Sequence, residues 1–189
     1  MEKKWNRKNA LWMLLYTVLY VIGTVLTCVL GSIHPIMFVC YQITAGLLLP
    51  GVVIKAFDRI KAPGVAACLS AGMIITFLAI NDAAAWHVIP VIIIAAAAEL
   101  VRRSSGYNWK GDLIGTVIMT FSTFGYYGQI WFNRDFTYES AVAEMPAGYA
   151  DTLMAVSPAW ALPVVVITGI AISVLVSKAT AKIFKIEKA

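Results

Sequence analysis

Six long apolar runs, separated by polar turns, constrain the fold of this chain more than any other feature. They cover residues 9–30, 35–54, 63–80, 86–103, 112–132 and 158–179. Each run is close to the ~20 residues that a helix needs to cross about 30 Å of hydrocarbon. The chain is 60% hydrophobic and only 13% charged, whereas a soluble domain is usually about a quarter charged. The sequence therefore predicts one all-α integral membrane domain, residues 1–189, with six transmembrane helices.

The basic residues lie in alternate turns. Residues 1–8, 55–61, 102–110 and 178–188 hold four, three, three and four of the 15 Lys and Arg residues, which leaves only Arg134. The positive-inside rule places those segments, and both termini, in the cytoplasm. One Lys or Arg at the centre of a helix would cost about 2.5–3.5 kcal/mol on insertion scales, which fixes the register of the six runs. This pattern explains the net charge of +5, so we expect no nucleic-acid partner.

The first run resembles a secretory signal because it follows a basic segment. It continues for about 20 residues without a clear small-residue cleavage site. We therefore expect it to be retained as a membrane helix.

A long polar and aromatic segment, residues 126–160, spans the junction of the fifth and sixth runs. Ordered loops longer than about 12–15 residues are uncommon in compact domains unless they serve a function. Within it, residues 138–156 are expected to form a short amphipathic helix at the membrane interface, broken at Pro146-Ala147-Gly148.

Motifs of membrane enzymes and metal sites are missing from the sequence. It contains no HExxH, GxSxG or P-loop pattern, and it has only two His and three Cys residues, without CxxC spacing. We therefore expect no metal, no cofactor and no catalytic activity. Glu99 precedes Arg102 and Arg103 by three and four residues, so we interpret it as a paired or solvated helix-end charge.

Polar and aromatic side chains gather instead in the three turns predicted to lie outside. Apolar walls with a few polar groups are typical of a small-molecule pocket. The candidate ligand contacts are His34, Asn81, Asp82, Trp86, His87, Tyr126, Gln129, Trp131, Arg134, Asp135 and Tyr149. Aromatic rings would stack on a planar ligand, while Arg134 or Asp82 would fix its charge. The competing interpretation is an interfacial aromatic belt, with Arg134 paired to Asp135 or Asp151.

Short motifs in the second half of the chain carry a family resemblance. They are Ala98-Glu99-Leu100 with the following basic pair, Gly106-Tyr107, Trp131-Phe132-Asn133-Arg134-Asp135, Ala147-Gly148-Tyr149 and Pro158-Ala159-Trp160. In order and spacing they resemble the Trep_Strep family of predicted S-components, which are the substrate-binding subunits of energy-coupling factor (ECF) transporters.

The resemblance implies a multi-pass protein of a prokaryotic plasma membrane, with the six-helix S-component fold and the long loop outside. It implies capture of a vitamin or another scarce nutrient at the outer face. It also implies a transmembrane coupling subunit and two cytoplasmic ATPase subunits as partners. Many S-components dock through an Ala-x-x-x-Ala pattern in the first helix. Here Gly23, Thr27 and Gly31 stand at that spacing, so either these residues substitute or another face, such as the third helix, docks.

Three alternatives remain open at this point. His34 and His87 both belong to outer turns and would suit an S-component specific for haem or another tetrapyrrole. A small membrane enzyme acting on lipid or isoprenoid would need clustered acids or a nucleophile–base pair at one depth. A structural or regulatory membrane protein would bind no small molecule at all.

Overall fold

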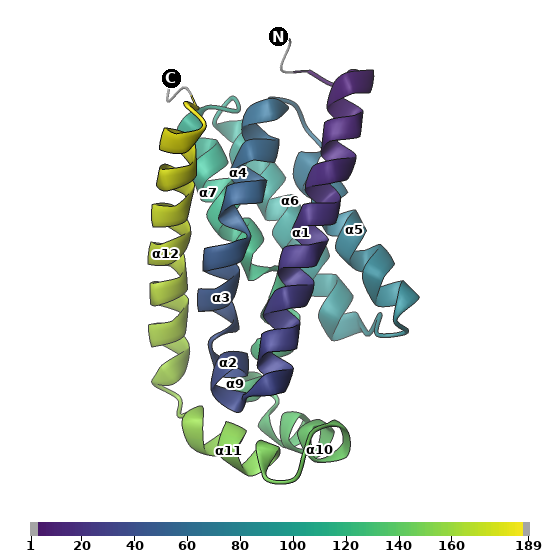
Figure 1. Cartoon of the computed structure of the whole chain (residues 1–189), viewed down its shortest axis with the longest axis vertical. Coiled ribbons are helices and arrows are strands. Elements are labelled where there is room, and N and C mark those ends of the chain that lie inside the picture. Colours follow the sequence, from purple (N-terminus) through teal and green to yellow (C-terminus); the bar gives the residue numbers. More distant parts are fainter. Residues whose placement is uncertain (1–3, 187–189) are drawn as a thin grey trace.

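The computed structural model describes residues 4–186, and every regular element in that part of the chain is a helix. The main helices run side by side along the long axis, and two short ones lie across one end (Figure 1). Three helices are long and apolar enough to cross a membrane: α1 (Arg7–Ile33), α6 (Ala85–Ser104) and α12 (Ala161–Ile183). Helix α5 (Val65–Ala79) is apolar but shorter. The expected all-α fold is confirmed.

The second apolar run, expected over residues 35–54 with an interruption at Pro50-Gly51, consists of three helices. These are α2 (Pro35–Val39), α3 (Tyr41–Leu48) and α4 (Pro50–Arg59). The break before α4 follows from Pro50, which occupies the first turn of α4 and has no N–H for a helical hydrogen bond. No Pro or Gly marks the other break, at Cys40, and the sequence did not predict it.

The fifth run, expected as one helix over residues 112–132, is also broken. Helix α7 (Trp109–Met119) passes into a 3₁₀ turn, η1 (Thr120–Thr123), and then into α8 (Phe124–Tyr127) and α9 (Gln129–Phe132). Hydroxyl groups compete for the backbone here, since Thr120 donates to the carbonyl of Val117 at 2.7 Å. The carbonyl of Met119 accepts a hydrogen bond from the Tyr20 hydroxyl at 2.8 Å. A broken helix inside an apolar domain needs such partners for its backbone groups.

Buried side chains satisfy one another around this break. The amide nitrogen of Gln42 donates to the Thr120 hydroxyl at 3.0 Å, and its amide oxygen accepts from the Tyr127 hydroxyl at 2.9 Å. Gln42, Thr120 and Tyr127 are all fully buried. Each buried polar group left unpaired would cost about 1–3 kcal/mol. The network therefore fixes α3 against η1 and α8.

Close backbone packing joins α3 to α12. A Cβ atom on Gly46 would lie 2.6 Å from the carbonyl oxygen of Gly169, and a Cβ atom on Gly169 would lie 2.6 Å from that of Gln42. Both distances are below contact, so only glycine permits this approach. Small residues serve this purpose between helices in lipid.

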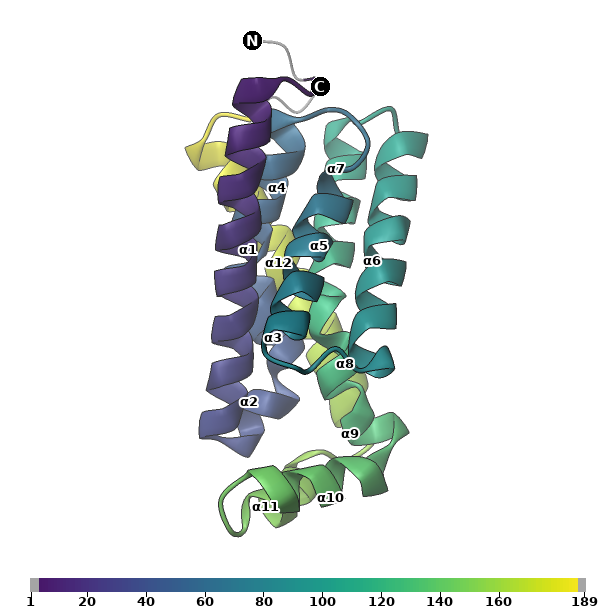
Figure 2. The ribbon, with the colours of Figure 1, turned by 90° about the vertical axis from the view of Figure 1, so that its right-hand side faces the viewer.

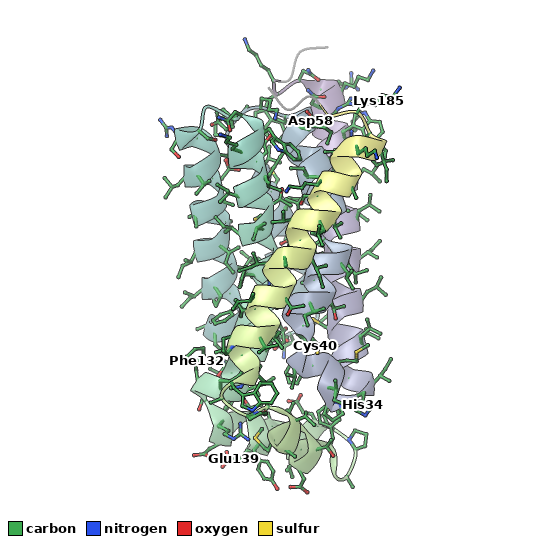
Figure 3. The ribbon with its side chains drawn as sticks, turned by 90° about the vertical axis from the view of Figure 1, so that its left-hand side faces the viewer. His34, Cys40, Asp58, Phe132, Glu139 and Lys185 are labelled. Atoms are coloured by element: carbon green, nitrogen blue, oxygen red, sulfur yellow. The ribbon has the colours of Figure 1, made fainter. Side chains whose placement is uncertain are left out.

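The two ends of the bundle differ in chemistry. Helix α1 begins and α12 ends at the same end, and Asp58 and Lys185 lie there, while His34 and Glu139 lie at the other (Figures 1 and 3). We call the first of these the basic end, because Arg59 and Arg102 lie in the last turns of helices that end there and Lys61 follows α4.

The basic end is fastened by buried charges. The Arg102 guanidinium donates to the Asp112 carboxylate at 2.9 Å and to the carbonyl of Ile60 at 2.9 Å. Glu99 accepts from the backbone N–H of Ala66 at 2.6 Å and lies 3.7 Å from Arg102. Glu99 is thus a paired helix-end charge, which agrees with one of the two sequence interpretations.

At the opposite end, α10 (Arg134–Glu144) and α11 (Tyr149–Val156) lie across the bundle (Figure 2). We call these two helices the cap. Gly148 precedes α11 with a φ of +81°, a conformation that favours glycine. The expected break at residues 146–148 is therefore confirmed, although the first helix of the cap begins four residues earlier than residue 138.

Candidate ligand-binding site

A cavity of about 450 Å³ lies beneath the cap. Its walls come from the end of α1, from α2 and α3, from the start of α6, from α8 and α9, and from both cap helices. Segments from most of the chain length therefore meet at this one place, opposite the basic end.

One wall of the cavity is a linked trio of Asp82, His87 and Tyr126. The Tyr126 hydroxyl donates to the Asp82 carboxylate. The His87 Nδ1 lies 3.1 Å from both the carboxylate and the backbone carbonyl of Asp82. Both of those oxygens only accept, so Nδ1 carries a proton. The His87 ring also stacks on Tyr126, with centroids 3.7 Å apart and planes 13° apart.

A glycine contact explains why these two rings meet. A Cβ atom on Gly125 would lie 2.2 Å from the carbonyl oxygen of Trp86, so only glycine lets α8 rest on the first turn of α6. The neighbouring residues Tyr126 and His87 are brought into register by that approach. The preceding turn is held by the backbone bond from Asp82 N–H to the carbonyl of Phe77 at 2.8 Å.

The cap supplies the opposite wall through one face of α10. Phe136, Ser140 and Glu144 line the cavity at intervals of four residues, which places them on one side of the helix. Phe136 meets Trp86 edge to face, with centroids 5.2 Å apart. Sequence reasoning missed this face, although its four-residue spacing was a readable signal.

Two tyrosines tie the cap and α3 to the last two turns of α1. The Tyr41 hydroxyl donates to the carbonyl of Cys28 at 2.8 Å, and the Tyr149 hydroxyl donates to the carbonyl of Gly31. The phenol of Tyr149 is a donor at neutral pH, and burial raises its pKa further, to about 12. Both hydroxyls are thus used to close the cavity.

The chain was compared with families of known proteins, and a family profile matches it. The sequence profile of a family described as hypothetical bacterial integral membrane proteins (Trep_Strep) matches residues 8–186. The chain belongs to the Trep_Strep family. No curated protein and no solved structure matched it. The membrane character read from the apolar runs is thereby confirmed, and the match includes the whole cavity and cap.

The structure brings six of the eleven candidate residues of this Trep_Strep protein to the cavity. They are Asp82, Trp86, His87, Tyr126, Gln129 and Tyr149. The residues that lie elsewhere are His34, Asn81, Trp131, Arg134 and Asp135.

Arg134 fastens the cap instead of facing the cavity. Its guanidinium donates to the carbonyl of Met154 at 2.6 Å and to that of Ser157 at 3.1 Å. A cation at the last carbonyls of a helix is favourable, so Arg134 holds α10 to the end of α11. The competing interpretation expected Arg134 to pair with Asp135 or Asp151. Arg134 pairs with neither of these residues.

The other outlying candidates also have local roles or positions. Asp135 is exposed beside Arg134, on the outer surface of α10. The Trp131 indole N–H donates to the carbonyl of Pro158 at 3.1 Å. Asn81 adopts a φ of +58° at the end of α5, and His34 accepts from the N–H of Ile36 at 3.2 Å to cap α2.

The placement of the histidines bears on the tetrapyrrole alternative. His87 lines the cavity and His34 does not. Within residues 4–186 there is no group of three or more His, Cys, Asp and Glu side chains that could hold a metal ion. The structure therefore does not assemble the two histidines into one axial site.

A second, apolar groove of about 280 Å³ adjoins the cavity between α1 and α5. The two spaces share Cys28, Ser32, Asp82 and Tyr126 in their linings. The cavity thus has a polar part below the cap and an apolar extension along α1.

Proposed function

We propose that this chain is the substrate-binding S-component of an ECF-type importer, which captures a small nutrient at the cap end. The observation that carries the proposal is the cavity of about 450 Å³ beneath the cap. Sites for small molecules are usually about 300–1,000 Å³, mostly apolar, with a few polar groups. The aromatic walls and the Asp82–His87–Tyr126 trio match that description.

The distribution of charge gives the proposal its orientation. The basic end would face the cytoplasm and the cap would face outward, in a prokaryotic plasma membrane. The chain would then cross the membrane six times, through α1, α2–α4, α5, α6, α7–α9 and α12. Breaks in two of these passes are tolerated because buried side chains satisfy the backbone.

The partners in this proposal are a transmembrane coupling subunit and two cytoplasmic ATPases, so this chain would itself catalyse no reaction. The small residues of α1 are not free to dock on them. Gly23, Thr27 and Gly31 are buried, and a Cβ atom on Gly23 would lie 2.8 Å from the Leu49 side chain. Helix α5 exposes small residues instead, which supports docking through the third membrane pass.

Native mass spectrometry of the purified protein tests the capture function directly. We expect a bound small molecule that is retained without ATP. A thermal-shift screen follows, because a ligand present at 100 times its dissociation constant adds about 2.7 kcal/mol of stability. A protein that carries no small molecule, and that no nutrient stabilises, would instead be structural or regulatory.

The ECF assignment needs a separate test. We expect the protein to co-purify with a coupling subunit and its ATPases when all are expressed together, and uptake to require ATP. A chain that binds its ligand but transports it without these partners would keep the capture function and lose the ECF assignment.

A further inference from the structure

We infer that the ligand is an organic cation that carries its charge on or beside a planar ring. This inference rests on the proposed capture function and names the substrate class for that same cavity. It follows from which charged groups and which ring faces the cap encloses.

The charge inventory of the cavity is negative. Two carboxylates line it, Asp82 on the turn before α6 and Glu144 on α10. Among the described residues that line the cavity none is Lys or Arg, and the only basic group is His87. The imidazole of His87 is already directed at Asp82 through Nδ1. Within the described residues, the lining therefore sets two carboxylates against a single imidazole and no Lys or Arg.

The sequence left the sign of the ligand charge open between Arg134 and Asp82. The structure removes Arg134 from the choice, because its guanidinium is bound to carbonyls at the end of α11. An anion in the cavity would face two carboxylates and, among the described lining residues, no Lys or Arg side chain. A cation would face two partners of opposite charge.

The aromatic walls of the cavity also suit a cation. Trp86 and Phe136 both line the cavity, and they are 46% and 38% exposed. The face of an aromatic ring attracts a cation, with energies of about 0.5–2 kcal/mol and the strongest effect for Trp. Uncovered rings beside carboxylates are thus able to replace part of the hydration shell that an organic cation loses.

The two carboxylates of the cavity, Asp82 and Glu144, differ in how firmly they are held. Asp82 is held by Tyr126 and His87, so its position is fixed before the ligand arrives. Glu144 is exposed at the end of α10 and belongs to the cap. A cation in the cavity would therefore meet one fixed carboxylate from the bundle, Asp82, and one carboxylate from the cap, Glu144.

The test compares probes of one shape and three charges on the full-length purified protein. One set is the 1-methylnicotinamide cation, neutral nicotinamide and the nicotinate anion. A two-ring set is N-methylquinolinium, quinoline and quinoline-3-carboxylate. Binding is measured by calorimetry and by thermal stability. We expect a cation to bind at least tenfold more tightly than its neutral analogue, and the anions to bind least.

Two variants assign the effect to the cavity. Glu144→Gln and Asp82→Asn should each weaken cation binding at least tenfold and leave the neutral analogue within about threefold. Glu139→Gln is the matched control, because Glu139 lies on the same helix outside the cavity lining. Should Asp82→Asn fail to fold, Glu144→Gln alone carries the test, since Glu144 is exposed.

The outcomes separate the two proposals. A neutral or anionic probe that binds as well as its cation, or a co-purified ligand that proves to be anionic, overturns this inference and leaves the capture function standing. If no probe of any charge binds and no small molecule co-purifies, the capture function fails, and this inference fails with it.

Discussion

The buried ion pair at the basic end offers the most direct test of how this bundle is held together. Arg102 and Asp112 join α6 to α7, and their side chains are 0% and 1% exposed. The same guanidinium reaches the carbonyl of Ile60 after α4 and lies over the ring of Phe57, 3.9 Å from its centroid. The perturbation is Asp112→Asn, which keeps the volume and removes the charge.

Removing one partner of a buried pair typically costs about 3–5 kcal/mol, because the other charge is left uncompensated. Here the expected loss is at the lower end, about 3 kcal/mol, since Glu99 stays 3.7 Å from Arg102 and backbone carbonyls still accept from it. One kcal/mol corresponds to about 2–4 °C in Tm for a domain of 150–250 residues. Asp112→Asn should therefore lower Tm by about 6–12 °C.

The assay is thermal unfolding of the purified protein in one detergent, with two companion variants. Arg103→Met removes the neighbouring exposed charge and should stay within about 0.5 kcal/mol of the parent. The double variant Arg102→Met with Asp112→Leu should recover most of the loss, because apolar residues often replace a buried pair without penalty. Lys61 also pairs with Asp112 and loses this partner in the double variant, but its side chain is 22% exposed and can extend toward water.

The reasoning fails if Asp112→Asn is no more harmful than Arg103→Met. It also fails if the double variant is as unstable as the single one, because the loss would then not come from an unpaired charge. Ligand binding at the opposite end should persist in each variant that folds.

Three further predictions concern the cap and the orientation. Gly125→Val should displace α8 and weaken ligand binding at least tenfold in calorimetry, because a Cβ atom at residue 125 would lie 2.2 Å from the Trp86 carbonyl oxygen. Gly51→Ala is the control and should bind ligand normally, because the nearest atom to its Cβ is 3.4 Å away. Arg134→Ala should speed proteolysis and hydrogen exchange within residues 134–157, because three hydrogen bonds to the end of α11 are lost. Arg134→Lys should restore little of the protection against proteolysis and exchange, because Lys cannot reproduce the geometry of the guanidinium. In a cysteine-free background, Glu139→Cys should react with an impermeant thiol reagent on intact cells and Lys185→Cys only after permeabilisation; the reverse pattern would refute the orientation.

Much of the fold could be predicted, because the insertion of a helix into a membrane depends on the length of its apolar run and on where the charged residues lie. The long runs that became α1, α6 and α12 needed no tertiary information. The break at Pro50 was also readable, since proline acts locally. The 3₁₀ turn at Thr120 was not, because it depends on Tyr20 and Gln42, which reach it from distant parts of the chain. A helix break that is satisfied by tertiary contacts leaves no mark in local sequence.

The candidate site shows the same division between local and distant causes. The turn holding Asp82 and His87 was found because polar residues interrupt apolar runs there. Arg134 was placed in the site as the only basic residue outside the four segments predicted to be cytoplasmic. The structure gives another reason for its isolated position. The cap needs one cation to hold the last carbonyls of α11, and Arg134 serves there. A lone charge in an outer loop is thus an ambiguous sign. The periodic face of α10 from Phe136 to Glu144 was the better indicator, because a helix that encloses a cavity must direct every fourth side chain into it.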